Sequence, residues 1–352
     1  MELKELRGKI DRIDGEILKL LNSRMEFALR TVKMKPGVED AEREKAVLDS
    51  AARHSRGLVR PAFSQKVFQD IISESKSLQK GNPKLAGFQG EHGAYSEVAA
   101  RAYDGKMVAI PCPEFLDVFE GVAKGQFDCG VVPVENSLAG AVTQVNDLLV
   151  ETDLKIVGEV KVPVHHCLLA LPDTDYREIK VVYSHPMALS QCRGFIARNK
   201  LEPRPYYDTA GAAMMLANER PKAAAAIASK LCAEIYDLDV LKENIEDHES
   251  NYTRFVVLAK EAGKEKGDKC SIIFSTAHKA GALFSVLKLF SDAGINLTRI
   301  ESRPAQKDIG NFAFLLDFQG SDTDSGVAKI LEQVRKEAKT YKFLGCYKEA
   351  RA

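Results

Sequence analysis

A long apolar seam in the first 34 residues restricts the fold of this chain more than any other sequence feature. Nine positions follow one another at spacings of four and three residues: Leu6, Ile10, Ile13, Ile17, Leu20, Arg24, Phe27, Thr31 and Met34. Most are apolar, so the pattern predicts a heptad seam along one long helix. A helix this long cannot bury its seam inside a unit of roughly 80 residues, and we expect two copies of the chain to intertwine as a homodimer.

Three segments with different rhythms follow one another along the chain. Residues 1–81 are predicted to be all-helical: Pro36-Gly37 ends the first helix, a second begins near Asp40 and a third near Pro61. In residues 83–260, short apolar runs alternate with helical stretches, which is typical of an α/β domain. A charged linker, Lys260 to Lys269, precedes residues 270–349, whose βαββαβ order predicts a ferredoxin-like α+β sandwich. The fold class is therefore multidomain.

Charge and composition exclude several classes of function. Lys+Arg and Asp+Glu both number 50, so the chain lacks the basic balance of a nucleic-acid-binding protein. The charged N-terminus is unlike a signal peptide, and no apolar run approaches the roughly 20 residues that a membrane span needs. Seven scattered cysteines without a CxxC pair argue against a zinc site or a disulfide framework. We expect a cytoplasmic protein with no metal, cofactor, membrane or nucleic-acid partner.

The helical segment places cations where apolar residues belong. Arg24 occupies a seam position, and Lys35 lies eleven residues later on the same helical face. The other two helices each offer a polar pair one turn apart, Asp40 with Glu44 and Ser75 with Gln79. Arg7 does not fit the face of Arg24 and lies about 25 Å away along the helix, so it suits the pocket of a partner chain. The set indicates either a seam cation that specifies register, with ordinary surface pairs, or a receptor for a dicarboxylate.

In the α/β segment, polar residues cluster where apolar runs end. They comprise Tyr95 and Ser96 after a Gly-x-x-Gly loop; Glu135, Asn136 and Ser137; Ser184 and His185; Asp208 and Thr209; and Thr253 and Arg254 before Phe255. Taken singly, such residues are more often helix caps or turns than ligands. Because sheet topology brings strand ends together, the set as a whole favours a binding site. Arg254 either anchors a carboxylate or pairs with an acid such as Glu135.

The stretches LRGKIDRIDGEILKLLNSR, DAEREKAVL and FQDIISESKSLQ resemble the all-helical chorismate mutase domain of bacterial bifunctional P-proteins. The resemblance implies a pocket built from the partner's Arg7 with Arg24, Lys35, Asp40, Arg43, Glu44, Ser75 and Gln79. It also implies a Claisen rearrangement of chorismate to prephenate. In that reaction the two arginines hold the carboxylates, with support from Ser75. Lys35 and Gln79 face the ether oxygen, and Asp40 and Glu44 hold the end with the ring hydroxyl.

The motifs GxxGxYS, PVENSxxG, YSHP and TRF, in that order, resemble prephenate dehydratase. The resemblance implies two α/β lobes like those of periplasmic binding proteins, and conversion of prephenate to phenylpyruvate. Thr253 is the expected catalytic hydroxyl. The implied substrate-binding set is Tyr95, Ser96, Glu135, Asn136, Ser137, Ser184, His185, Gln191, Thr209, Arg254 and Phe255.

Two stretches of the last segment resemble the ACT domain of these dehydratases. They are Gly281-Ala282-Leu283 and Glu301-Ser302-Arg303-Pro304. The resemblance implies that they bind phenylalanine as a feedback inhibitor across a dimer interface. Two other interpretations remain open: a dehydratase whose helical domain only dimerises, and an amino-acid sensor without catalysis.

Overall fold

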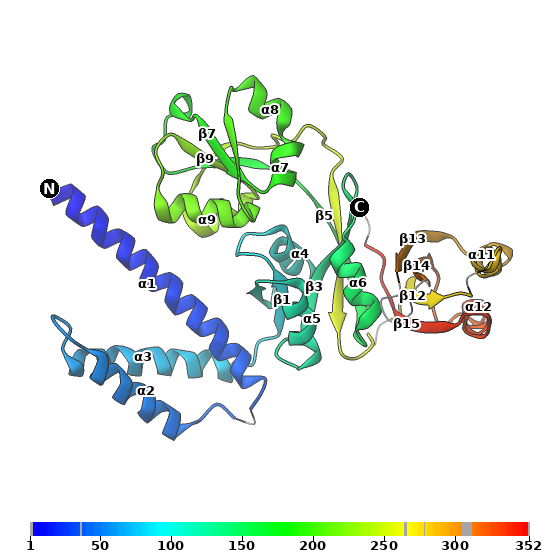
Figure 1. The fold of residues 1–352 in the computed structure, drawn as a ribbon. Helices are drawn as coiled ribbons and strands as arrows, with labels where there is room; N and C mark the ends of the chain where they lie inside the picture. The colour runs from blue at the N-terminus through cyan, green and yellow to red at the C-terminus, as the bar shows by residue number, and fades with distance from the viewer. Residues whose placement is uncertain (1–2, 36, 264–265, 278, 305–311, 351–352) are drawn as a thin grey trace.

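A computed structural model describes residues 3–35, 37–263, 266–277, 279–304 and 312–350. The chain forms a helical domain, a central α/β domain of two lobes and a C-terminal α+β domain, in that order (Figure 1). This arrangement confirms the multidomain fold class that the sequence predicts. Pro36, the expected end of the first helix, lies outside the described residues.

The helical domain consists of α1 (Leu3–Val32), α2 (Ala41–His54) and α3 (Pro61–Lys80). Helices α2 and α3 pack against each other, whereas the N-terminal half of α1 diverges from both (Figure 1). The seam of α1 is therefore exposed within one chain: Leu6 is 42% exposed, Ile10 57%, Ile13 55%, Ile17 49% and Leu20 70%. Exposed apolar side chains at this density are what an intertwined partner would cover, and the dimer stays a prediction.

The first α/β lobe is a mixed sheet with the strand order β2-β1-β3-β11-β5, and a short β4 pairs with β3. Its elements are β1 (Leu85–Gln89), α4 (Tyr95–Tyr103), β2 (Val108–Cys112), α5 (Phe115–Ala123), β3 (Cys129–Asn136), β4 (Gly140–Ala141), α6 (Thr143–Glu151), β5 (Lys155–Pro163) and β11 (Tyr252–Ala259). Strand β11 lies between β3 and β5 and is antiparallel to both. It begins at Tyr252, so the polar residues before Phe255 belong to the strand itself.

The second lobe is a sheet of order β10-β6-β9-β7-β8. Its elements are β6 (Cys167–Ala170), the 3₁₀ turn η1 (Tyr176–Glu178), β7 (Val181–Ser184), α7 (Pro186–Gln191), α8 (Arg193–Arg198), β8 (Glu202–Pro205), α9 (Thr209–Glu219), β9 (Ala224–Ala228), α10 (Lys230–Tyr236) and β10 (Asp239–Lys242). The chain crosses between the lobes twice, after β5 and before β11. The two crossings are tied together because Val164 N donates to the carbonyl oxygen of Asn251 at 2.8 Å.

The C-terminal domain is an antiparallel sheet of order β13-β14-β12-β15, with helices α11 and α12 on one face. Its elements are β12 (Lys269–Ser275), α11 (Ala282–Asp292), β13 (Leu297–Pro304), β14 (Phe312–Gln319), α12 (Ser325–Glu337) and β15 (Thr340–Tyr347). The other face of the sheet packs on the first lobe, where Leu315 and Tyr347 share a hydrophobic core with Val134 and Leu149. The first lobe and the C-terminal domain are thus one packed unit. Among the described residues, no helix is long and apolar enough to cross a membrane.

Candidate functional sites

The helical domain brings Arg24, Ser75 and Gln79 together between α1 and α3. Arg24 Nη1 donates to Ser75 Oγ at 2.6 Å, and Gln79 Nε2 donates to the carbonyl oxygen of Ala28 at 2.5 Å. Ser75 and Gln79 are buried, each 7% exposed. Burial, and to a lesser extent repulsion from Arg43, lowers the pKa of Arg24. An anion bound beside Arg24 would therefore stabilise its charged form.

The N-terminus of α2 supplies the acidic side of the same domain. Asp40 caps α2 by accepting a hydrogen bond from Arg43 N at 3.1 Å. Glu44 pairs with Lys76 at 2.6 Å, and Lys35 Nζ donates to the carbonyl oxygen of Val38 at 3.4 Å. The sequence patterns did not single out Lys76. Its position between Ser75 and Gln79 on α3 could have indicated that it lies near the same site.

Arg7 lies apart from this cluster within one chain. Its side chain is exposed, and it lies seventeen residues before Arg24 on α1, about 25 Å away along the helix. The structure therefore links Arg24 to Ser75 and places Arg43 close enough to repel it, but leaves Arg7 in the half of α1 that diverges from α2 and α3. This geometry is compatible with a site shared between two chains.

In the α/β domain, four residues form what we call the hydroxyl cluster: Asn136, Ser137, Asn251 and Thr253. Asn136 Nδ2 donates to Asn251 Oδ1 at 2.7 Å and to Thr253 Oγ1 at 3.0 Å. Ser137 Oγ accepts a hydrogen bond from Tyr252 N at 3.0 Å. The cluster joins the ends of β3 and β11, which are paired in register at Asn136 and Thr253.

This network orients the Thr253 hydroxyl. Asn136 Oδ1 accepts hydrogen bonds from the backbone N–H groups of Leu138 and Ala139, so its amide can only present hydrogens to Thr253. A hydroxyl oxygen that accepts a bond keeps its own hydrogen for another acceptor. Thr253 is thereby prepared as a donor. Asn251, which the sequence analysis did not single out, is buried, and its Nδ2 has no hydrogen-bond partner among the described residues.

A second polar chain crosses from one lobe to the other through His166. Tyr95 OH donates to the carbonyl oxygen of His165 at 2.6 Å and lies 3.0 Å from His166 Nδ1. His166 Nε2 lies 2.9 Å from Gln191 Oε1. Burial lowers the pKa of His166, which favours the neutral ring. His166 thus links the predicted residues Tyr95 and Gln191. In the sequence, the only indication of this link is the pair His165-His166 just before β6.

The remaining predicted residues lie at strand ends or helix starts, Ser96 in the first lobe and the others in the second. Ser184 is fully buried and donates to the carbonyl oxygen of Ile227 at 2.6 Å, and His185 caps α7. Thr209 begins α9 after Asp208, which caps that helix and whose pKa burial raises. Ser96 is buried in the first turn of α4. These contacts are structural in this state, as the capping interpretation of the sequence allowed.

Arg254 and Glu135 do not join the hydroxyl cluster but face the C-terminal domain. Arg254 is 2% exposed and binds three carboxylates: Glu135 at 2.8 Å, Glu159 at 2.8 Å and Asp317 of β14 at 2.7 Å. We call these four residues the ionic joint. Of the two sequence alternatives for Arg254, the structure shows pairing with acids. Phe255, the next residue, is buried in the core of the first lobe.

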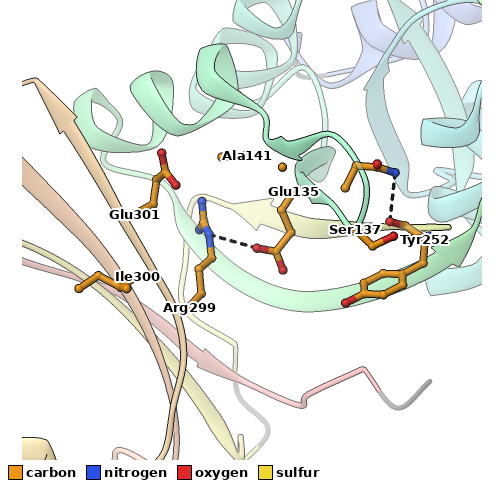
Figure 2. Close-up of a pocket in the computed structure, with 9 residues that line it drawn as sticks. Glu135, Ser137, Ala141, Tyr252, Arg299, Ile300 and Glu301 are labelled. Atoms are coloured by element: carbon orange, nitrogen blue, oxygen red, sulfur yellow. Dashed lines mark hydrogen bonds and ion pairs between the residues drawn. The ribbon is translucent and has the colours of Figure 1, made fainter. Parts of the chain in front are cut away.

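The two predicted effector stretches lie at separate places in the C-terminal domain. Gly281 has φ +82° and precedes α11, which begins with Ala282 and Leu283, while Glu301 to Pro304 end the edge strand β13. Arg303 holds Asp147 of α6 at 2.7 Å. A pocket of about 280 Å³ lies between β13 and the end of β3. Figure 2 shows Arg299 and Glu135 facing each other across it, with Glu301 beside them.

Comparisons with known proteins match all three domains. Family models match residues 6–80 (chorismate mutase type II), 86–263 (prephenate dehydratase) and 271–336 (ACT domain). A bifunctional chorismate mutase/prephenate dehydratase of Aquifex aeolicus is 37% identical, covering 99% of this chain and 98% of the relative.

Solved structures match about three quarters of the chain. One is prephenate dehydratase from Arthrobacter aurescens in complex with L-Phe, 32% identical with a TM-score of 0.70, over 76% of this chain and 90% of that one. Another is GqqA, described as a novel type of quorum quenching acylase, 33% identical with a TM-score of 0.71, over 76% of this chain and 98% of that one.

Proposed function

This chain belongs to the family of bifunctional chorismate mutase/prephenate dehydratases, and from that premise we propose how its residues carry out the two reactions and their regulation. The enzyme rearranges chorismate to prephenate and then converts prephenate to phenylpyruvate, and its ACT domain fits control by phenylalanine. The observation that carries this conclusion is the order of three matching domains along nearly the whole chain.

For the mutase step, we assign the cations of the helical domain to substrate carboxylates. The rearrangement is pericyclic, so the site has to hold the compact conformer and stabilise charge on the ether oxygen. Arg24 is positioned by Ser75, and the same side of α3 presents Gln79. In this proposal Lys35 and Gln79 face the ether oxygen, while Asp40, Arg43 and Glu44 line the opposite end. Lys76 sets the orientation of Glu44 through their ion pair.

For the dehydratase step, Thr253 orients the departing 4-hydroxyl of prephenate by donating a hydrogen bond to it, and keeps its own proton. The bond to the ring carboxylate breaks and carbon dioxide leaves, its electron pair makes the ring aromatic, and the C4–O bond breaks so that the hydroxyl departs as hydroxide, which solvent protonates to water. The orientation of Thr253 by Asn136 supports this role, because the hydrogen is aimed before the substrate binds. We assign Tyr95, Ser96, Ser137, Ser184, His185, Gln191 and Thr209 to the surrounding substrate site.

For regulation, we propose that phenylalanine binds at the Gly281 and Glu301 stretches. The ionic joint then links the ACT domain to β11, the strand that carries Thr253. Arg254 follows Thr253 in β11 and contacts Asp317 in the ACT domain. Allostery needs two sites whose states depend on each other, and this shared strand is a physical connection between them. Glu135 and Arg254 serve in this joint in our proposal.

We further propose a cytoplasmic homodimer in which Arg7 completes the partner's mutase site. The exposed seam and the outward position of Arg7 support this arrangement. Mixing Arg7→Ala with Arg24→Ala protein under subunit exchange should restore one intact site per heterodimer and return mutase activity. Proven exchange without recovery would place the whole site within one chain.

The proposed function as a whole is tested by turnover of the purified full-length protein. Chorismate should yield phenylpyruvate with transient prephenate, and added phenylalanine should reduce the second step. Conversion of prephenate but not chorismate would favour a dehydratase with a merely dimerising helical domain. Binding of phenylalanine without either conversion would favour a sensor.

A further inference from the structure

Two cysteines that lie far apart in the sequence face each other in the C-terminal sheet. Cys270 in β12 and Cys346 in β15 are directly opposite in the antiparallel register. Opposite residues on antiparallel strands have Cα atoms about 4.5–5.5 Å apart and side chains on the same face. Disulfides span about 4.4–6.8 Å between Cα atoms, so the backbone already has the required separation.

The two thiols also converge at one point. Both Sγ atoms approach the carbonyl oxygen of Gly320, Cys270 at 3.4 Å and Cys346 at 3.7 Å. A hydrogen bond between the thiols is the largest cause that raises the pKa of Cys270 and lowers that of Cys346. Cys346 is therefore the member of the pair that more readily becomes a thiolate, the reactive form.

Access distinguishes this pair from the other cysteines. All seven cysteines are free, six are buried, and Cys346 alone of the seven is partly exposed. Part of Cys346 is therefore in contact with solvent, whereas its partner Cys270 is fully buried. Reactive cysteines in redox sensors share this pattern of an accessible thiol beside a second, resolving thiol.

We propose that Cys270 and Cys346 form a reversible disulfide, making the ACT domain of this enzyme a site of oxidative modification by peroxides. The Cys346 thiolate attacks one peroxide oxygen, which breaks the O–O bond and gives a sulfenic acid at Cys346 and hydroxide. Cys270 then attacks the Cys346 sulfur, the S–O bond breaks, and the oxygen leaves as water. Two thiols are oxidised, hydrogen peroxide is reduced to two waters, and a dithiol reductant reverses the reaction.

The bond would cross-link β12 to β15 beside the contact with the first α/β lobe. Lys269, the residue before Cys270, binds Glu159 of the ionic joint at 2.9 Å. Tyr347, the residue after Cys346, hydrogen-bonds Ser271 Oγ at 2.7 Å. The modification site is thus one residue from the place where the two domains meet.

The test is to treat reduced full-length protein with hydrogen peroxide, denature it in N-ethylmaleimide, and measure the intact mass. The seven labels of the reduced protein should fall to five, one cross-linked peptide should contain Cys270 and Cys346, and dithiothreitol should restore seven labels. Cys112→Ser, which removes a buried cysteine elsewhere, should still lose two labels on oxidation.

Single variants resolve the order of steps. Cys270→Ser should stop at the sulfenic acid of Cys346, which dimedone traps, and Cys346→Ser should keep all six of its labels. The proposal is overturned by any of three results at doses that oxidise other exposed thiol proteins. These are retention of seven labels, over-oxidation of Cys346 without a cross-link in the wild type, or a disulfide mapped to another pair or between chains.

Discussion

Removing the Arg254 guanidinium should destabilise the enzyme more than any surface ion-pair change, because the charge sits inside the ionic joint. Arg254→Met keeps an unbranched apolar stem and deletes the guanidinium with its charge. Around it, Glu135, Glu159 and Asp317 would remain, and of these Glu159 and Asp317 are almost completely buried. Burial by itself would lower the pKa of Arg254, and the carboxylates, Asp317 foremost, instead raise it well above the usual value.

The magnitude follows from the charges that are left. Lys269 still holds Glu159 at 2.9 Å, and Arg299 reaches Glu135 and Asp317 only at 3.6 Å and 3.8 Å. Three acids would thus share two cations in a dry site. Breaking a buried pair in this way costs roughly 3–5 kcal/mol. At about 2–4 °C per kcal/mol, the melting temperature should fall by roughly 10 °C.

Scanning calorimetry on the full-length variant measures this loss, with Lys124→Met as the matched control. Lys124, the residue that follows α5, pairs with Glu120 one turn earlier; both are exposed, and such pairs contribute only about 0.3–0.5 kcal/mol. Asp317→Asn should reproduce part of the Arg254 effect, and the double variant should cost less than the sum of the two. A fall of less than 2 °C for Arg254→Met would show that the joint does not hold the domains together, and the reasoning from burial would be wrong.

Three further predictions concern the sites and their coupling. Thr253→Val should reduce dehydratase turnover by at least about 100-fold, with mutase turnover and melting temperature nearly unchanged; near-normal dehydratase turnover would remove Thr253 from catalysis. His92 joins Glu26 of α1 at 2.8 Å to Glu97 of α4 at 3.1 Å, and although burial opposes it, these bonds raise the pKa of His92 to about 9. The stability that charged His92 contributes to the fold should be complete below about pH 6.5 and be lost as the pH rises through about 9. The difference in melting temperature between wild type and His92→Gln should therefore close over that range, and a constant difference would contradict the assignment. Ala282→Asp adds an acid that the N-terminus of α11 tolerates but that repels an amino-acid carboxylate, and it should abolish phenylalanine inhibition without reducing uninhibited turnover; unchanged inhibition would move the effector site elsewhere.

Local sequence patterns were sufficient for most of the elements and drew attention to several candidate site residues. The heptad spacing specifies α1 because residues three and four apart share one face of any helix, whatever surrounds it. The βαββαβ order of the last segment likewise follows from runs of apolar residues and the helical periods between them. Asn136 and Thr253 stand out only as members of a set: one polar residue at a strand end is more often a cap or a turn, whereas several such ends can meet at one edge of a sheet.

Partners across the fold were decided only by tertiary structure. The acids that bind Arg254 come from 63 to 119 residues away, and Cys346 lies 76 residues from Cys270, so no local period relates them. Which way Arg254 faces depends on the register of β11 between β3 and β5, and a shift of one residue would have exchanged it with Thr253. The seven cysteines look scattered in the sequence, yet strand pairing places two of them face to face. Residue types and periods are local properties of the chain, whereas charge pairing and thiol proximity depend on distances that exist only once the sheets and domains have packed.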